Sequence, residues 1–101
     1  MIIPSSVKIL GHEYVVKKIE LGSGHEICGD CDASASVIRI NTQITRTQME
    51  STFLHEVIEA INSLLDLGLA HPQIMGVEVG LYQVLTENGL LREIADLGER
   101  E

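Results

Sequence analysis

Aromatic side chains are nearly absent from this chain of 101 residues, which has one Phe, two Tyr and no Trp. Proteins that bind single-stranded nucleic acid stack its bases on aromatic rings set among basic residues. No such platform is visible here, so nucleic acid is not an expected partner. With so few aromatics, the core must be built from Ile, Leu and Val, within a hydrophobic fraction of 45%.

Basic residues are also scarce, with seven Lys and Arg against fifteen Asp and Glu and a formal net charge of −8. Such a chain is repelled by phosphate backbones and by anionic membranes. No apolar run approaches the length that spans a bilayer, and the opening MIIPSSVKIL lacks the basic lead-in and cleavage site of a signal peptide. The sequence therefore predicts a cytoplasmic protein with no membrane partner, whose two cysteines are thiols.

The first half of the chain has the pattern of strands. Four segments show alternation or β-branched content, the third more weakly than the others: residues 7–10, 13–21, 25–32 and 36–41. Gly11 and His12 stand between the first two segments and suit a tight hairpin turn. In the last segment the alternation places Asn41 on the face opposite the isoleucines. We expect three to four short antiparallel strands within residues 6–41.

The second half has the period of helices. Thr45 or Thr47 can cap the start of a first helix at residues 46–67, and Gly68 can close it. The sequence has no internal repeat and no domain linker, so one domain is expected to span residues 1–101.

A second helix is expected at residues 72–88, because Pro72 suits a first helical turn and a Gly follows the last periodic residue. Residues 90–101 form a short last helix or fray. The fold class predicted from these elements is α+β, with a small antiparallel sheet packed on two main helices.

The segment TFLHEVIEAI contains the start of a zinc-peptidase motif. His55 and Glu56 match the first two positions of H-E-x-x-H, in which two histidines on one helical stripe bind zinc. Glu59 stands where the motif has its second histidine. Because His55 and Glu59 are four residues apart, their side chains can share a ligand. The alternative is that these residues form an ordinary solvated polar face.

Glu78 conflicts with the pattern of the second helix, since it lies in the middle of that helix's apolar stripe. A carboxylate that faces a core is costly unless it is paired or binds a metal. His71 lies on the same meridian, just before the helix. Glu78 is therefore expected to face the first helix, where it either joins a metal site or forms a buried ion pair with His55 or His71.

Together, TFLHEVIEAINSLLDL and HPQIMGVEVGLYQVL resemble the ImmA/IrrE-type minimal zinc metallopeptidases of phages and mobile elements, with H-E-x-x-E in place of H-E-x-x-H. The strands ahead of the helix fit the same family, so the resemblance covers most of the chain. It implies a minimal zincin fold in which His55 is the first metal ligand, Glu56 is the general base and Glu78 is the downstream carboxylate ligand. Glu59 departs from the family's pattern.

Glu59 is expected as the third ligand ahead of His71, which lies about two turns from Glu78, roughly 10 Å along the helix axis. A His/Glu/Glu set is harder and more anionic than the His/His/Glu set of catalytic zinc sites. The expected cofactor is therefore zinc or another divalent metal, with manganese or iron as competitors.

The predicted function is metal-dependent hydrolysis of a protein or peptide through a metal-bound water, with Glu56 taking and passing on the proton. An exposed strand edge near residues 25–31 or 36–41 would hold the substrate by strand addition. The alternative, favoured by Glu59, is a non-catalytic relative of the same fold that binds another protein, with or without a metal.

Cys28 and Cys31 have C-x-x-C spacing, and His25 stands three residues ahead of them. A zinc knuckle needs a fourth ligand, and a redox pair normally opens a helix, whereas this pair lies among strand signals. In an extended segment the two side chains point to opposite faces. We expect no functional role for them, the alternative being a thiol or metal-binding module. His12 is expected to be an exposed surface residue.

Overall fold

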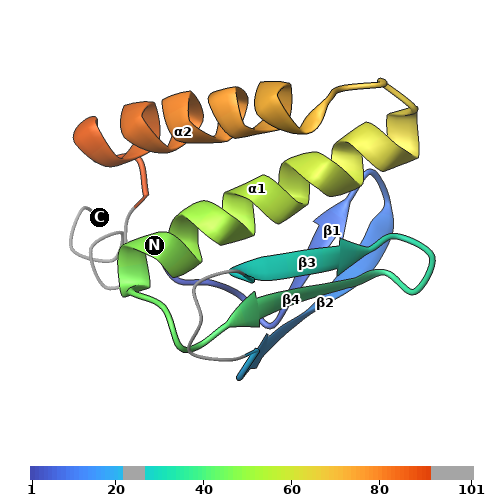
Figure 1. Cartoon of the computed structure of the whole chain (residues 1–101), viewed down its shortest axis with the longest axis horizontal. Helices are drawn as coiled ribbons and strands as arrows, with labels where there is room; N and C mark the ends of the chain where they lie inside the picture. Colours follow the sequence, from blue (N-terminus) through green and yellow to red (C-terminus); the bar gives the residue numbers. More distant parts are fainter. Residues whose placement is uncertain (22–26, 92–101) are drawn as a thin grey trace, which may run out of the picture.

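A computed structural model describes residues 1–21 and 27–91 and shows three layers (Figure 1). A four-stranded sheet forms the first layer, one helix covers it, and a second helix lies on the first. The elements are β1 (Ser6–Ile9), β2 (His12–Ile19), β3 (Gly29–Asp32), β4 (Val37–Asn41), α1 (Arg46–Leu65) and α2 (His71–Glu87). The expected short last helix at residues 90–101 lies almost entirely outside the described residues.

The sheet has the order β1-β2-β4-β3 and is mixed. β1 pairs with β2 and β3 with β4 in the antiparallel sense, whereas β2 and β4 are parallel. The α+β fold class is confirmed, but the prediction of an antiparallel sheet is wrong for this central pair. Successive strands alternate in direction, and β4 rather than β3 lies beside β2, so the pair that skips a strand is parallel.

The position of α2 also differs from the prediction that both helices pack on the sheet. α1 contacts β1, β3 and β4, whereas α2, within the described part of the chain, packs only on α1. The outer side of α2 leaves Val77 and Val79 more than half exposed. Ile74 and Glu78 are the buried residues of α2. α1 is therefore enclosed from two sides, and much of its polar face is not solvated.

The core lies between the sheet and α1. Its buried apolar members are Ile9, Tyr14, Val16, Ile38, Ile40, Phe53 and Ala60. As the alternation in residues 36–41 predicted, both isoleucines of β4 point into this core, and they are fully buried. Asn41 was expected on the opposite, polar face but is fully buried as well. Its side chain accepts from the backbone N–H of Leu21 and Gln43 and donates to the carbonyl of Ile27, which offsets the cost of burial.

Local turn chemistry sets the ends of the elements, with two shifts from the prediction. The β1–β2 turn is formed by Leu10 and Gly11, both with positive φ, and not by Gly11 and His12. His12 is the first residue of β2 and is exposed, as expected. At the end of α1, Asp66 adopts the left-handed conformation at φ 51°, so the helix closes before Gly68.

The other predicted helix ends are confirmed. Thr45 caps α1 by accepting from the backbone N–H of Gln48, whose side chain in turn accepts from the N–H of Thr45. Pro72 lies in the first turn of α2, and Asn88 caps its end. Neither helix is long and apolar enough to cross a membrane, nor is any other helix in the described part of the chain.

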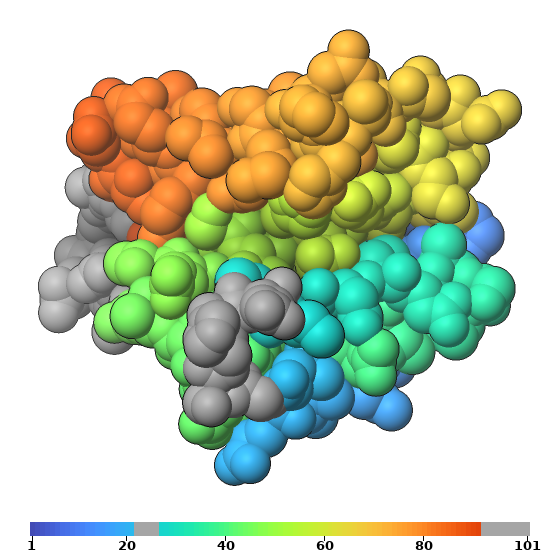
Figure 2. All heavy atoms as spheres, viewed as in Figure 1, coloured from blue at the N-terminus to red at the C-terminus, as the bar shows by residue number. Residues whose placement is uncertain are grey.

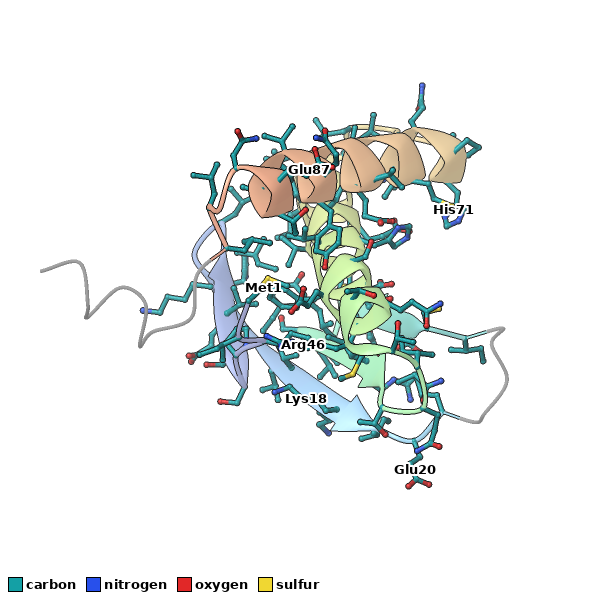
Figure 3. All side chains as sticks on the ribbon, turned by 90° about the vertical axis from the view of Figure 1, so that its left-hand side faces the viewer. Met1, Lys18, Glu20, Arg46, His71 and Glu87 are labelled. Atoms are coloured by element: carbon teal, nitrogen blue, oxygen red, sulfur yellow. The ribbon has the colours of Figure 1, made fainter. Side chains whose placement is uncertain are left out.

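A buried carboxylate ties α2 to the start of α1. Glu50 is 6% exposed. It accepts a 2.6 Å hydrogen bond from the Tyr82 hydroxyl, and its other oxygen lies 3.3 Å from Arg46 Nε and 3.4 Å from the Met1 amino group. Figure 3 shows Met1 and Arg46 close together beneath α2. This network holds one end of the helix pair, opposite the end at which α2 begins.

Gly29 is the one glycine of β3, and it has no room for a side chain between this strand, β4 and α1. An added Cβ would lie 2.5 Å from the carbonyl oxygen of Arg39 and 2.7 Å from Thr52 Cγ2. We expect Gly29→Ala to lower the free energy of unfolding by about 1–3 kcal/mol, because β3 must move away from β4 and α1. Urea denaturation measures the change.

The matched control is Gly76→Ala on the outer side of α2, where an added Cβ meets nothing within 4 Å. This substitution is expected to raise the free energy of unfolding by roughly 0.5–1 kcal/mol, since it only restricts the unfolded chain. Equal effects of the two substitutions would contradict the close packing of β3 on α1.

Candidate metal centre

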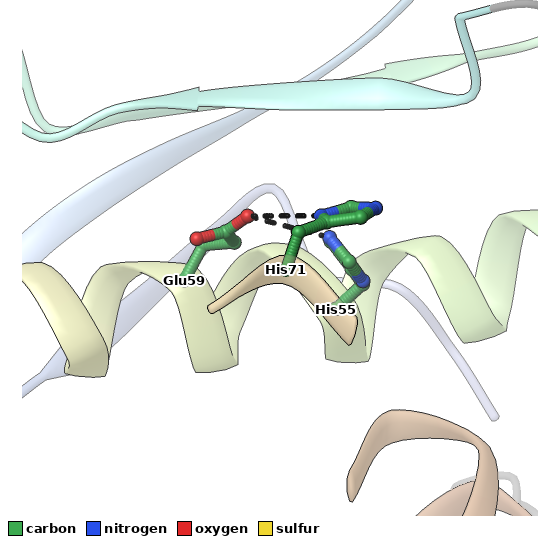
Figure 4. Close-up of side chains that lie close together, drawn as sticks. All are labelled: His55, Glu59 and His71. Carbon is green, nitrogen blue, oxygen red and sulfur yellow. Dashed lines mark ion pairs between the residues drawn. The ribbon is translucent and has the colours of Figure 1, made fainter. Parts of the chain in front are cut away.

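Three side chains that could bind a metal converge where α2 begins beside the middle of α1 (Figure 4). His55 Nε2 lies 3.5 Å from Glu59 Oε2, one helical turn further along α1. His71, the first residue of α2, places its Nδ1 3.9 Å from the same Glu59 oxygen. One ligand atom from each of the three residues lies within 4.8 Å of the others. His55, Glu59 and His71 could therefore hold a metal ion.

The loop between the helices brings His71 to this position. The Asn62 side chain on α1 accepts a 2.9 Å hydrogen bond from the backbone N–H of Leu69 and donates to the carbonyl of the same residue. These two hydrogen bonds to the backbone of Leu69 fix the chain two residues before His71. The imidazole rings of His55 and His71 consequently meet edge to face, with centroids 5.2 Å apart.

Exposure differs sharply across the three side chains. His55 is 13% exposed, Glu59 34% and His71 63%. A metal held by them would therefore have protein on the α1 side and solvent on the His71 side. Catalytic metal sites need such an open position for water or substrate, whereas structural sites are closed.

Glu78 faces α1, as its place in the apolar stripe predicted, and it is 7% exposed. Its Oε1 lies 3.2 Å from His55 Nδ1, and its Oε2 accepts a hydrogen bond from the Ser51 hydroxyl. The two nitrogens of one imidazole ring point in different directions, so a single metal ion can take only one of them. Glu78 thus lies on the other side of His55 from Glu59 and His71, and it does not belong to the group of three.

Glu56 lies beside this group and is buried, with 6% of its surface exposed. The interpretation of this stretch as a solvated face is therefore wrong. Burial raises the pKa of the Glu56 carboxyl to about 7; the neighbouring His55 opposes the shift, and the carboxylates of Glu59, Asp30 and Glu78 add to it. A carboxyl group with a pKa near neutrality can exchange a proton under physiological conditions.

Two adjoining cavities flank the candidate metal group, and both lie between β3 and the helices. The larger has a volume of about 680 Å³ and reaches to Met75 on α2; the smaller, of about 390 Å³, reaches to Ser63 on α1. His55, Glu56 and His71 line both. Figure 2 shows this face of the molecule, with α1 visible between α2 and β3.

β3 ends the sheet, since only β4 pairs with it among the described residues. The edge strand beside the metal group is thus the segment around Cys28 to Asp32, and the alternative candidate at residues 36–41 is wrong because β4 is an interior strand. Gly29 and Asp30 of β3 line both cavities. β3, the edge strand among the described residues, and the candidate metal group therefore line the same space.

The two cysteines are free thiols, each partly buried. Cys31 packs against the core. Burial, with a contribution from Glu56 and Glu59, raises its pKa to about 11. It is therefore protonated at neutral pH and a poor nucleophile. Within residues 1–21 and 27–91, neither cysteine belongs to the group that could hold a metal ion, and His25 lies outside these ranges.

The structure brings together three of the four residues that the sequence suggested as ligands. His55, Glu59 and the alternative ligand His71 converge. Glu78 contacts the Nδ1 atom of His55, on the side of the ring away from Glu59. Ser51 was not predicted to have a role. Its signal in the sequence was its position four residues before His55 on the same stripe of α1.

No family model, no curated protein and no solved structure matches this chain.

Proposed function

We propose that this protein is a metal-dependent peptidase of minimal zincin type, which binds its metal through His55, Glu59 and His71. The observation that carries the proposal is the convergence of these three side chains beside a buried glutamate and a free strand edge. Two imidazoles and one carboxylate are the ligand set of a large class of catalytic zinc sites. The chain thus has the donors of an H-E-x-x-H site, with the second imidazole supplied by α2 and the carboxylate by α1.

The donor set fits zinc and does not exclude other divalent metals. Two histidines and one carboxylate with open positions also bind iron(II) in oxygenases. We take zinc as the resident metal, because Glu56 provides the proton acceptor that hydrolysis needs. A divalent metal bound here would polarise a scissile carbonyl group and a water molecule.

Glu56 is assigned the role of general base. Its carboxylate takes a proton from the attacking water and passes it to the leaving amine. A pKa of about 7 suits both steps, since the group is ionised in part of the molecules and holds the proton readily once it has received it. The assignment is supported by its position, since Glu56 lines both cavities and a substrate bound there would lie beside it.

The substrate is proposed to be an extended segment of a peptide or protein. β3 can pair with it along the edge on which no described strand pairs, and residues of β3 line the cavities that His55 and Glu56 also line. Such pairing would align the substrate backbone with the metal group and leave its side chains to the cavities. The free thiols of the chain suit a reducing compartment, and we place the activity in the cytoplasm.

The first test is zinc titration with His71→Ala, and His12→Ala is the matched control. His71→Ala is expected to lower zinc affinity by at least about 100-fold, because loss of a direct ligand should exceed the 10–100-fold effect of losing an outer partner. His12 is an exposed histidine at the start of β2, so its removal should leave the affinity unchanged. Isothermal titration calorimetry measures both, and equal affinity in the two variants would contradict the metal centre.

A second candidate function is supported by the exposed apolar surface of α2, in particular Met75, Val77 and Val79. A non-catalytic relative would use the same fold to bind another protein, and its metal would only brace the two helices. This candidate predicts that no peptide in a broad pool is hydrolysed, whether or not zinc is bound. The same pool, incubated with the zinc-loaded protein, therefore separates the two functions.

A further inference from the structure

His55 has a partner on each of its ring nitrogens, and the two partners come from different helices. Nε2 faces Glu59 on α1 at 3.5 Å, and Nδ1 faces Glu78 on α2 at 3.2 Å. A neutral imidazole carries a proton on one nitrogen and a lone pair on the other. Only the nitrogen with the lone pair can bind a metal. Whatever sets the position of that proton therefore decides whether His55 can serve as a ligand on the Glu59 side.

Both oxygens of Glu78 are engaged by residues of α1. Oε2 accepts a hydrogen bond from Ser51, and Oε1 lies against His55, one helical turn beyond Ser51. The Glu78 side chain is 9% exposed, and a carboxylate so buried needs such partners to offset its desolvation. The Ser51 hydroxyl also fixes which oxygen remains for the imidazole.

We propose that Glu78 and Ser51 form a relay that positions His55, so that Nδ1 carries the proton and Nε2 presents its lone pair to the metal. The inference rests on the proposed metal centre. In it, Glu78 hydrogen-bonds to the ligand His55 and does not bind the metal itself. A carboxylate that accepts the N–H of a metal-binding histidine fixes the ring's tautomer and orientation and raises its basicity. Glu78 is therefore a positioning residue.

The relay couples the metal site to the packing of the two helices. α2 contributes His71 at its first turn and Glu78 two turns later, and both act on groups of α1. A shift of α2 along α1 would displace the direct ligand and the supporting carboxylate together. Metal binding should thus strengthen the contact between the helices beyond the effect of any one ligand.

The experiment compares Glu78→Gln with Glu87→Gln, an exposed glutamate on the same helix. Glu78→Gln keeps the shape and one acceptor oxygen but removes the charge. It is expected to lower zinc affinity by about 10–100-fold, as loss of an outer carboxylate does at other metal sites, without loss of helical circular dichroism. Glu87→Gln should match the wild type. Ser51→Ala, which leaves Glu78 charged but less constrained, should give a smaller loss in the same direction.

The tautomer of His55 provides the readout that a merely structural role would not change. In the metal-free wild type, ¹⁵N spectra of the neutral ring should show the Nδ1–H form. Glu78→Gln should give a mixture of the two forms, because a neutral amide has less preference for the donor nitrogen. This measurement needs no metal and no activity, so it tests the relay even if the proposed function is wrong.

Two results would overturn the relay. One is a wild-type protein whose His55 is mainly in the Nε2–H form, since its lone pair would then face Glu78. The other is unchanged zinc affinity in Glu78→Gln while His71→Ala loses it, since the metal would then bind without support from Glu78. If no variant, including the wild type, binds zinc but the Nδ1–H form is present, the proposed metal centre fails and the positioning of His55 stands.

Discussion

Glu56→Gln is expected to lower the rate of peptide hydrolysis by the zinc-loaded protein by about 10²–10⁴-fold, the usual contribution of a positioned proton-transfer group. The amide of glutamine is similar in shape to the carboxyl group but cannot take a proton from water. Zinc affinity should not change, because the three proposed ligands are His55, Glu59 and His71. The readout is the rate of cleavage of a broad peptide pool, with zinc content measured in the same sample.

The control for this experiment is Glu13→Gln, which removes an exposed carboxylate of β2 that lines neither cavity. Its rate should equal that of the wild type. Hydrolysis that persists in Glu56→Gln would refute the role of Glu56 as the base. A zinc-loaded wild type that cleaves nothing would instead favour the non-catalytic relative, in which Glu56 is only a buried acid.

The metal-free protein is expected to lose roughly 2–3 kcal/mol of stability as the pH rises from about 4.5 through about 7. The cause is Glu56, whose pKa is raised from its ordinary 4.5 to about 7 in the folded chain, chiefly by burial. Below pH 4.5 the group is protonated in both the folded and the unfolded states. Between the two values the folded state binds more protons than the unfolded one, so its stability falls as the pH increases. Above pH 7 the full cost of a buried charge is present.

Glu56→Gln removes this dependence and isolates it from the other titrating groups. In urea denaturation with a chelator present, the variant should be more stable than the wild type at about pH 8 and nearly equal to it at about pH 4. The difference between the two proteins is the quantity to plot against pH. Parallel profiles would mean that Glu56 titrates normally in the folded state, and the burial argument would be wrong.

The two predictions together describe a residue whose burial lowers the stability of the folded chain and whose proposed role is proton transfer. A glutamine would fill the same space on α1 without the desolvation cost of a charge, and a leucine would pack better against the core. Buried acids whose pKa is shifted toward neutrality and that line a cavity are candidates for functional sites. Glu56 meets each of these criteria, since it is 6% exposed and lines both cavities.

The sequence by itself determined the two main helices and the fold class, and it pointed to the residues from which the candidate metal group is drawn. Thr45, Pro72 and Asn88–Gly89 act within one or two turns of chain, so their effect on helix ends follows from local chemistry. The period of α1 places His55 and Glu59 on one stripe, because residues four apart on a helix are neighbours. Glu78 was predicted to face α1 on energetic grounds alone, since a carboxylate in an apolar stripe needs a partner.

The tertiary structure decided how these parts meet. Periodicity defines the faces of an element but not its neighbour, so the parallel pairing of β2 with β4 and the stacking of α2 on α1 were not predictable from it. The same limit applied to the site. From the sequence, Glu59 was expected as a ligand ahead of His71. The reason was the distance between His71 and Glu78 along the axis of the second helix, which is too long for both to bind one metal easily.

In the folded chain His71 meets Glu59 instead, across the gap between two helices. Asn62 holds the connecting loop through Leu69 and so sets where α2 begins. Glu78 contacts the Nδ1 atom of His55, whereas Glu59 faces the Nε2 atom of the same ring. The direction in which an imidazole presents its lone pair depends on which partner reaches each nitrogen, and only the packing of α2 on α1 determines this.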